Sequence, residues 1–259
     1  MYKLQQICKM YIFFYARFMT PFLLSIATFI STLSGGLTGL KNQRSLQRLL
    51  GYTAGVLLGV VTFDLLPEIF KILSEQHRSA TTAMVALVAG FLVFHIVEKT
   101  ILIHYSQELD YKVHSHPHVG VASALALSGH SFLDGVGIGL GFQASTSVGV
   151  AVAIAVIAHD FTDGLNTVNL MLLNKNKSKR AFMFLLLDAT TPILGVASTL
   201  LFKVPDHALT LYLGFFAGFL LYIGASEILP AAHSKDSSYK TIGLTILGVV
   251  FMFIVTRLA

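Results

Sequence analysis

Long apolar stretches recur along the whole chain and constrain its fold more than any other feature. Bounded by charged residues, glycine or proline, they cover residues 19–40, 51–73, 82–104, 119–142, 146–171, 181–203, 207–229 and 240–258. Each is near or above the roughly 18 residues that an α-helix needs to cross the hydrocarbon core of a bilayer. With 54% hydrophobic and only 12% charged residues, the chain is typical of integral membrane proteins. We therefore expect one all-α transmembrane domain of eight helices over residues 1–259.

Basic residues are concentrated in alternate loops of this predicted topology. The first, third, fifth and seventh loops contain most of the loop lysines and arginines, among them Lys41, Arg44, Lys175, Lys177 and Arg180. By the positive-inside rule these loops are cytoplasmic, and both termini lie outside a plasma or cytoplasmic membrane. Topology thus explains the net charge of +5, and we expect no nucleic-acid partner. The single cysteine, Cys8, excludes an internal disulfide and a thiolate metal cage.

A histidine and an aspartate four residues apart occur in two successive apolar stretches. The fourth stretch contains His-Ser-Phe-Leu-Asp-Gly from His130, and the fifth contains His-Asp-Phe-Thr-Asp-Gly from His159. Residues four apart share one face of a helix, so two facing helices bring His130, Asp134, His159 and Asp163 together. Ionisable groups are costly at membrane depth, which indicates a functional reason for their presence.

Two imidazoles and two carboxylates form a donor set suited to a divalent transition metal such as zinc, iron or manganese. Asp160 adds a third carboxylate directly after His159, and Ser131 offers a weak oxygen ligand opposite it. A second metal position beside the first is consistent with these groups. Because the ligands must be deprotonated, occupancy of the site should fall as the pH falls.

The repeats resemble the paired histidine-and-acid motifs on the fourth and fifth helices of the ZIP (Zrt/Irt-like) family of metal transporters. Asp64-Leu-Leu-Pro-Glu68 and Glu227-Ile-Leu-Pro230 resemble that family's segments on the second and seventh helices. The resemblance implies an eight-helix bundle that moves zinc, and also iron or manganese, toward the cytoplasm, with no prosthetic group. It also suggests a homodimer in the lipid bilayer. The implied metal ligands, between the fourth and fifth helices, are His130, Asp134, His159, Asp160 and Asp163.

The chain departs from the family's pattern at several positions. Ser131 replaces an asparagine often found there, which weakens the case for a full second metal position. Leu133 and Thr162 stand where a proline usually precedes the acid, so a local kink is in doubt. On the sixth helix Asp188 lies about one turn before Pro192, where many relatives have a Glu-Pro pair. Asp188 either faces the same cavity or caps the backbone that Pro192 frees.

Further acids and histidines outline a path for ions. Asp64 and Glu68 form a gate or exit relay, unless Glu68 only meets the interface beside Lys71. Glu227 lies at the cytoplasmic mouth or is solvated there. The third loop contains a His-rich tract that either binds metal loosely or is a plain solvated loop, with His114, His116 and His118. His95 is interpreted as a packing or interface residue.

Two functions compete for this set of residues. An intramembrane zinc-dependent hydrolase would need a fixed zinc with an open position and an aspartate base. A transporter needs weak, exchangeable binding and a path on both sides of the site. The duplicated motif, the acids on neighbouring helices and the lack of an obvious nucleophile favour the transporter, and we expect no enzyme activity.

Overall fold

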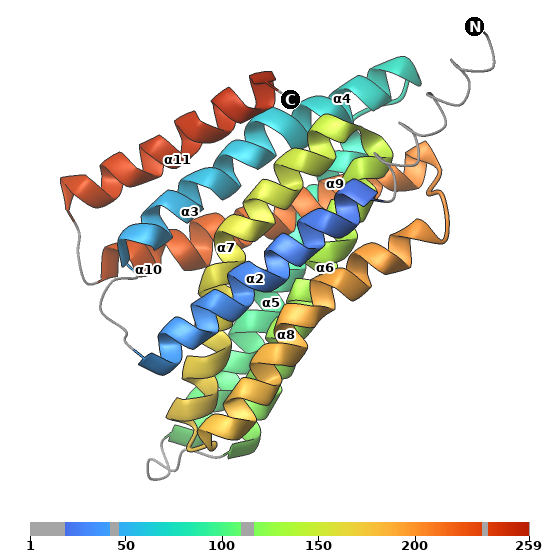
Figure 1. Ribbon diagram of the computed structural model, residues 1–259. Coiled ribbons are helices and arrows are strands. Elements are labelled where there is room, and N and C mark those ends of the chain that lie inside the picture. The colour runs from blue at the N-terminus through green and yellow to red at the C-terminus, as the bar shows by residue number, and fades with distance from the viewer. Residues whose placement is uncertain (1–18, 42–46, 110–116, 235–237, 259) are drawn as a thin grey trace, which may run out of the picture.

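The computed structural model is a bundle of long helices packed along their lengths (Figure 1). The structure describes residues 19–41, 47–109, 117–234 and 238–258, and these parts contain no strand. The helices are α2 (Thr20–Lys41), α3 (Gln47–Val60), η2 (Val61–Leu65), α4 (Leu66–Glu75), α5 (Thr81–Leu109), α6 (Pro117–Ala144), α7 (Thr146–Leu173), α8 (Ser178–Leu200), α9 (Asp206–Leu221), η3 (Tyr222–Ile228), α10 (Leu229–Ser234) and α11 (Tyr239–Leu258).

Each of the eight predicted apolar stretches coincides with one helical run. Two of these runs are compound, because a π-helical turn joins α3 to α4 and another joins α9 to α10. In the described part of the chain, six helices are long and apolar enough to cross a membrane: α2, α6, α7, α8, the run from α9, and α11. The protein is therefore a multi-pass membrane protein.

The other two helical runs are α5 and the run from α3 to α4. In α5, the segment Thr81–Val97 is apolar. The run from α3 to α4 carries Asp64, Glu68 and Lys71 within its second half. Charged groups lower the mean hydropathy of a helix even where the fold buries them, and Asp64 is buried here. Ionisable residues in such a position are a sign of function.

The helices form two groups, within which the packing is most extensive. The first group contains α2, α6, α7 and α8, and the second contains α3, α5, α9 and α11. In Figure 1, α2 crosses in front of α7, and α11 lies beside α3. Glycines allow the closest approaches in both groups: Gly35 faces the backbone of Phe161, Gly55 that of Thr245, and Gly90 that of Phe215.

The glycine that ends each repeat has a packing role. Gly135 of α6 lies against the backbone of Pro192 in α8, and Gly164 of α7 lies against the backbone of Thr32 in α2. A side chain at either position would collide with main-chain atoms that cannot rotate away. In each Asp-Gly pair, the aspartate is therefore next to a point where its helix and a neighbouring helix approach each other closely.

Hydroxyl groups hold α7 in place immediately before His159. Ser31 of α2 donates a 2.7 Å hydrogen bond to the carbonyl oxygen of Ile157. Thr53 of α3 donates one of 3.2 Å to that of Ala158. These bonds come from both helix groups, so they set the height of His159 in the bundle.

Both α6 and α7 continue as α-helices through Leu133 and Thr162, where the absence of proline left a kink in doubt.

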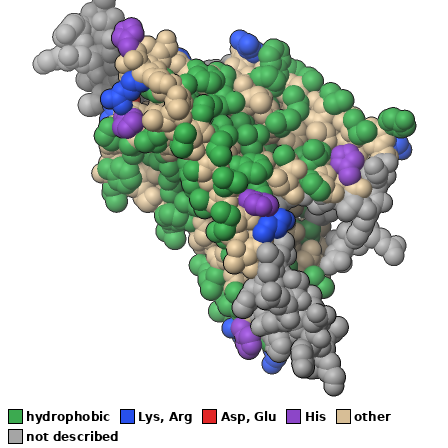
Figure 2. All heavy atoms as spheres, turned by 180° about the vertical axis from the view of Figure 1, so that it is seen from behind, with side chains coloured by type: hydrophobic (Ala, Val, Ile, Leu, Met, Phe, Trp, Pro, Cys, Tyr) green, Lys and Arg blue, Asp and Glu red, His purple; other side chains and the backbone are tan. Residues whose placement is uncertain are grey.

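The outer surface of the bundle is apolar, as a bilayer requires. Figure 2 shows hydrophobic side chains spread over the back of the molecule. The exposed hydrophobic residues of the bundle include Val85, Val88, Leu92 and Ile96 of α5. Polar residues of the two repeats, among them Asp134, His159 and Asp163, are buried instead, and the candidate site therefore lies inside the bundle.

Candidate metal centre

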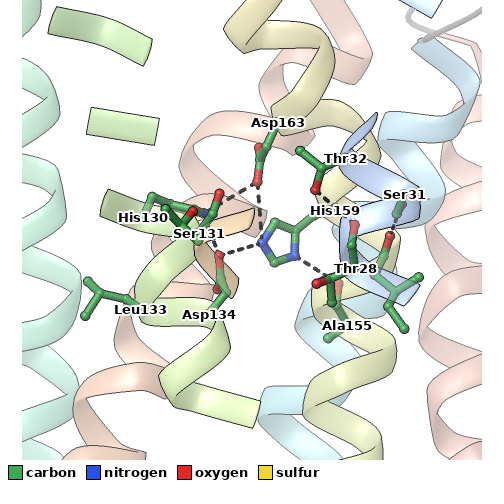
Figure 3. A network of polar contacts seen from close by, with 12 residues as sticks. Thr28, Ser31, Thr32, His130, Ser131, Leu133, Asp134, Ala155, His159 and Asp163 are labelled. Atoms are coloured by element: carbon green, nitrogen blue, oxygen red, sulfur yellow. Dashed lines mark hydrogen bonds and ion pairs between the residues drawn. The ribbon is translucent and has the colours of Figure 1, made fainter. Parts of the chain in front are cut away.

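The two repeats face each other near the middle of α6 and α7. His130 and Asp134 lie one turn apart on α6, and His159 and Asp163 lie one turn apart on α7. Each pair projects from one side of its helix, as the spacing of four predicts. Figure 3 shows all four side chains converging on one point between the helices. One ligand atom from each residue lies within 4.8 Å of the other three.

The distances between nitrogen and oxygen atoms are short throughout this four-residue group. Nε2 of His130 lies 3.2 Å from Oδ2 of Asp134 and 3.6 Å from Oδ2 of Asp163. Nε2 of His159 lies 3.4 Å and 3.6 Å from the same two oxygens. Each imidazole thus meets a carboxylate of its own helix and one of the facing helix, and neither repeat is complete alone.

A hydrogen bond within α7 fixes the orientation of His159. Nδ1 of His159 lies 2.9 Å from the carbonyl oxygen of Ala155, which can only accept, so Nδ1 carries the proton. Nε2 of the neutral ring then presents its lone pair toward the carboxylates. Histidine ligands of metal ions commonly have such an outer hydrogen bond. The His159 side chain is fully buried, whereas that of His130 retains 12% exposure.

Asp160, predicted as a further metal ligand, lies outside the four-residue group. Its side chain is fully buried, and neither carboxylate oxygen has a hydrogen-bond partner. It is close enough to Asp134, Asp163 and Asp188 for electrostatic interaction. Burying a carboxylate without a partner is costly, so this group also favours the binding of a cation nearby.

Asp188 of α8 joins the surroundings of the site through two hydroxyl groups. Ser131 of α6 donates a 2.7 Å hydrogen bond to Oδ1 of Asp188. Thr167 of α7 donates one of 2.6 Å to Oδ2. The fully buried carboxylate therefore faces α6 and α7. Ser131, predicted as a weak metal ligand, uses its hydroxyl proton in this bond.

The alternative role for Asp188, as a cap for the backbone freed by Pro192, is wrong. Proline has no N–H, so the carbonyl oxygen four residues earlier loses its helical donor, and that oxygen belongs to Asp188 itself. The hydroxyl of Thr191 donates a 2.7 Å hydrogen bond to it. Thr191 satisfies the backbone, and the Asp188 carboxylate remains available to α6 and α7.

Asp64 lies in the π-helical turn η2, three residues before Pro67. Pro67 has no N–H to donate to the preceding turn, and the hydrogen-bonding pattern of the helix is irregular there. Asp64 is buried, and its Oδ2 has no hydrogen-bond partner. Glu68 forms a 3.3 Å ion pair with Lys71, so its contact there is the interface pairing that was the alternative to a gate.

The remaining predicted pathway residues are placed only in part. Glu227 lies in η3, a second π-helical turn that precedes Pro230. His118 is exposed at the start of α6, whereas His114 and His116 lie outside the described residues. The ring of His95 packs edge-on against Tyr222 with centroids 5.7 Å apart, as the packing interpretation expected.

Several residues around the site were not foreseen. Thr167 follows His159 and Asp163 at the next helical interval of four, so periodicity alone would have found it. Phe219 of α9 and Phe94 of α5 pack against His130 with ring centroids 4.7 Å and 6.4 Å away. No sequence signal identifies them, because apolar aromatic residues occur throughout the chain.

In comparisons with known proteins, the chain is similar to zinc transporters. Residues 108–256 match the family described as ZIP Zinc transporter. The chain is 24% identical to a zinc transporter ZupT of Streptococcus mutans over 252 residues, which cover 92% of this chain and 95% of that protein. It is also 24% identical to a ZupT of Chlorobium limicola over 259 residues, covering 92% of this chain and 96% of the relative.

Proposed function

The chain belongs to the ZIP zinc transporter family, and from this premise we propose that it carries zinc across a membrane through the four-residue group of His130, Asp134, His159 and Asp163. Family membership makes the protein a metal transporter and not an enzyme, so the hydrolase alternative is set aside. Iron and manganese are proposed as further substrates, because nitrogen and carboxylate ligands accept both ions.

The spacing of the ligand atoms supports this proposal most directly. Zinc binds nitrogen and oxygen ligands at about 2.0–2.2 Å in a tetrahedron, which places the ligand atoms about 3.3–3.6 Å from one another. The four nitrogen-to-oxygen distances in the group run from 3.2 to 3.6 Å. All separations among the four ligand atoms lie within 4.8 Å, so side-chain movements of about an ångström would bring them into a tetrahedron around one ion.

Charge favours a divalent ion at the same place. Asp134 and Asp163 are buried, with side-chain exposures of 0% and 9%. Oδ1 of Asp134 has no hydrogen-bond partner, and buried Asp160 stands close by. A cation with two charges neutralises the pair of carboxylates that approach it, which removes much of the cost of burying them.

The side of the membrane on which Asp64 acts follows from the predicted topology. With the odd-numbered loops in the cytoplasm, the loop between α4 and α5 lies outside, and so does the end of the run that carries Asp64. Thr53 lies level with Ala158 in the site, and Asp64 is about 16 Å farther along the same helix at 1.5 Å per residue. Asp64 then serves the outer side of the path, not the exit.

The remaining features are proposed on the family resemblance. These are transport toward the cytoplasm, outward termini, one domain over residues 1–259, a plasma or cytoplasmic membrane, and a homodimer. Asp160 and Asp188 are proposed as auxiliary groups beside the four ligands, since both are buried and within electrostatic reach of Asp134. The His-rich loop is proposed as a weak metal store near the exit.

Metal uptake into proteoliposomes tests the proposal. The parent protein is compared with His159→Ala and Asp163→Ala, and with Thr190→Ala as a matched control on α8, where the hydroxyl bonds only within its own helix. We expect the two site variants to lose zinc uptake and the control to retain it. Uptake at the parental rate by both site variants would show that the metal passes elsewhere.

A further inference from the structure

His130 and His159 are held in the site by different means. The ring of His159 is fixed by the hydrogen bond from Nδ1 to Ala155 of its own helix. In the described part of the chain, Nδ1 of His130 makes no such bond. An imidazole can adopt a broad range of terminal torsion angles, so neighbouring side chains must orient this ring by packing against it.

The rings that pack against His130 from outside the site belong to the second helix group. Phe219 of α9 approaches it at 4.7 Å between centroids and 64°, and Phe94 of α5 at 6.4 Å and 86°. Both are edge-to-face arrangements, the geometry that aromatic quadrupoles favour. The ring of His159 also meets that of His130 edge-to-face, with centroids 5.8 Å apart. His130 is thus in contact with one fellow ligand and with two phenylalanines.

Phe219 is itself firmly placed. Its side chain is buried, with 1% exposure. It packs against Phe94 at 4.0 Å and against Phe216 at 5.6 Å between centroids. A ring with so little freedom can restrain its neighbour. Its position relative to α6 depends on how the second helix group sits against the first, because α9 belongs to one and His130 to the other.

We propose that Phe219 is a positioning residue that keeps the imidazole of His130 directed at the metal, so that the contact between α9 and α6 sets the affinity of the site. This inference rests on the proposed function, since it requires His130 to be a ligand. All four ligands are on α6 and α7, and His130 alone among them depends on rings from the second group. A movement that separates α9 from α6 frees this ligand first and weakens binding, which promotes release of the ion.

Cobalt(II) titration of the purified full-length protein in detergent tests this role, because visible cobalt absorption reports both affinity and coordination. Phe219→Leu keeps most of the buried apolar volume but removes the aromatic edge. Phe142→Leu on α6 is the matched control, since that ring packs on Gly149 and has no ring contact with His130 or Phe219 in the described part of the chain. We expect about tenfold weaker cobalt binding and an altered spectrum for Phe219→Leu, the size typical of losing an outer-sphere contact.

A double variant separates positioning from general packing. In a His130→Ala background, Phe219→Leu should cause no further loss, because there is no imidazole left to orient. The inference is overturned if Phe219→Leu binds cobalt as the parent does, if Phe142→Leu weakens binding equally, or if Phe219→Leu reduces affinity by the same factor without His130. If His130→Ala alone leaves binding unchanged, the proposed metal site falls together with this inference.

Discussion

The hydroxyl of Thr167 donates a 2.6 Å hydrogen bond to Oδ2 of Asp188, joining α7 to α8 one turn beyond Asp163. Both residues are fully buried. The bond connects the helix that carries half of the candidate ligands to a helix that carries none. It therefore contributes to the stability of the first helix group and to the position of an acid beside the metal centre.

Thr167→Val should destabilise the protein by about 2 kcal/mol, because a buried carboxylate loses one of its two hydroxyl donors while the shape of the side chain is kept. Thermal unfolding of the detergent-solubilised protein measures the change. Thr167→Ser, which restores the hydroxyl, should recover most of it. Thr190→Val is the control, since that hydroxyl bonds only within α8 at an exposed position. Equal losses for Thr167→Val and Thr190→Val would contradict the prediction.

The glycines of the two repeats should not tolerate even a methyl group. Gly135→Ala meets the backbone of Pro192, and Gly164→Ala meets that of Thr32. Each substitution should cost about 1–3 kcal/mol through overpacking and lower the yield of folded protein. Gly129→Ala on α6 is the matched control, because no atom lies within 4 Å of its added carbon. Melting temperatures of the purified variants measure this loss of stability. If Gly129→Ala lowers the melting temperature as much as the other two substitutions do, the packing argument is refuted.

Zinc should stabilise the folded protein through the four-residue group. At about one hundred times its dissociation constant, a ligand that binds only the folded state adds about 2.7 kcal/mol. A thermal shift with zinc is therefore expected for the parent and should disappear in His159→Ala and in Asp134→Asn. Magnesium, which prefers all-oxygen octahedral sites, should give no comparable shift. A zinc shift that survives in both variants would place the ion at another site.

Asp64→Asn should separate transport from binding. The residue lies about 16 Å along its helix from the level of the site, so the four-residue group is left intact. We expect near-parental zinc affinity by calorimetry and slower zinc uptake into proteoliposomes, because the buried acid no longer attracts the ion on its way. Lower affinity at unchanged maximal uptake would assign Asp64 to the binding site instead.

The helices and the pairing of ligands within each of them follow from local sequence patterns. Hydrophobicity and charge are local properties, and the eight apolar stretches predicted the helical runs to within a few residues. The spacing of four is equally local, since it puts His130 above Asp134 and His159 above Asp163 on any α-helix.

Only the tertiary structure decided how these helices face one another. Asp160 and Asp163 both belong to α7, yet only Asp163 joins the four-residue group, because close packing at Gly135 and Gly164 fixes the rotation of α6 and α7. The partners of Asp188 come from two other helices, and Phe219 reaches His130 from the second helix group. Such contacts join residues far apart in the chain, and they depend on side-chain packing that no local pattern encodes.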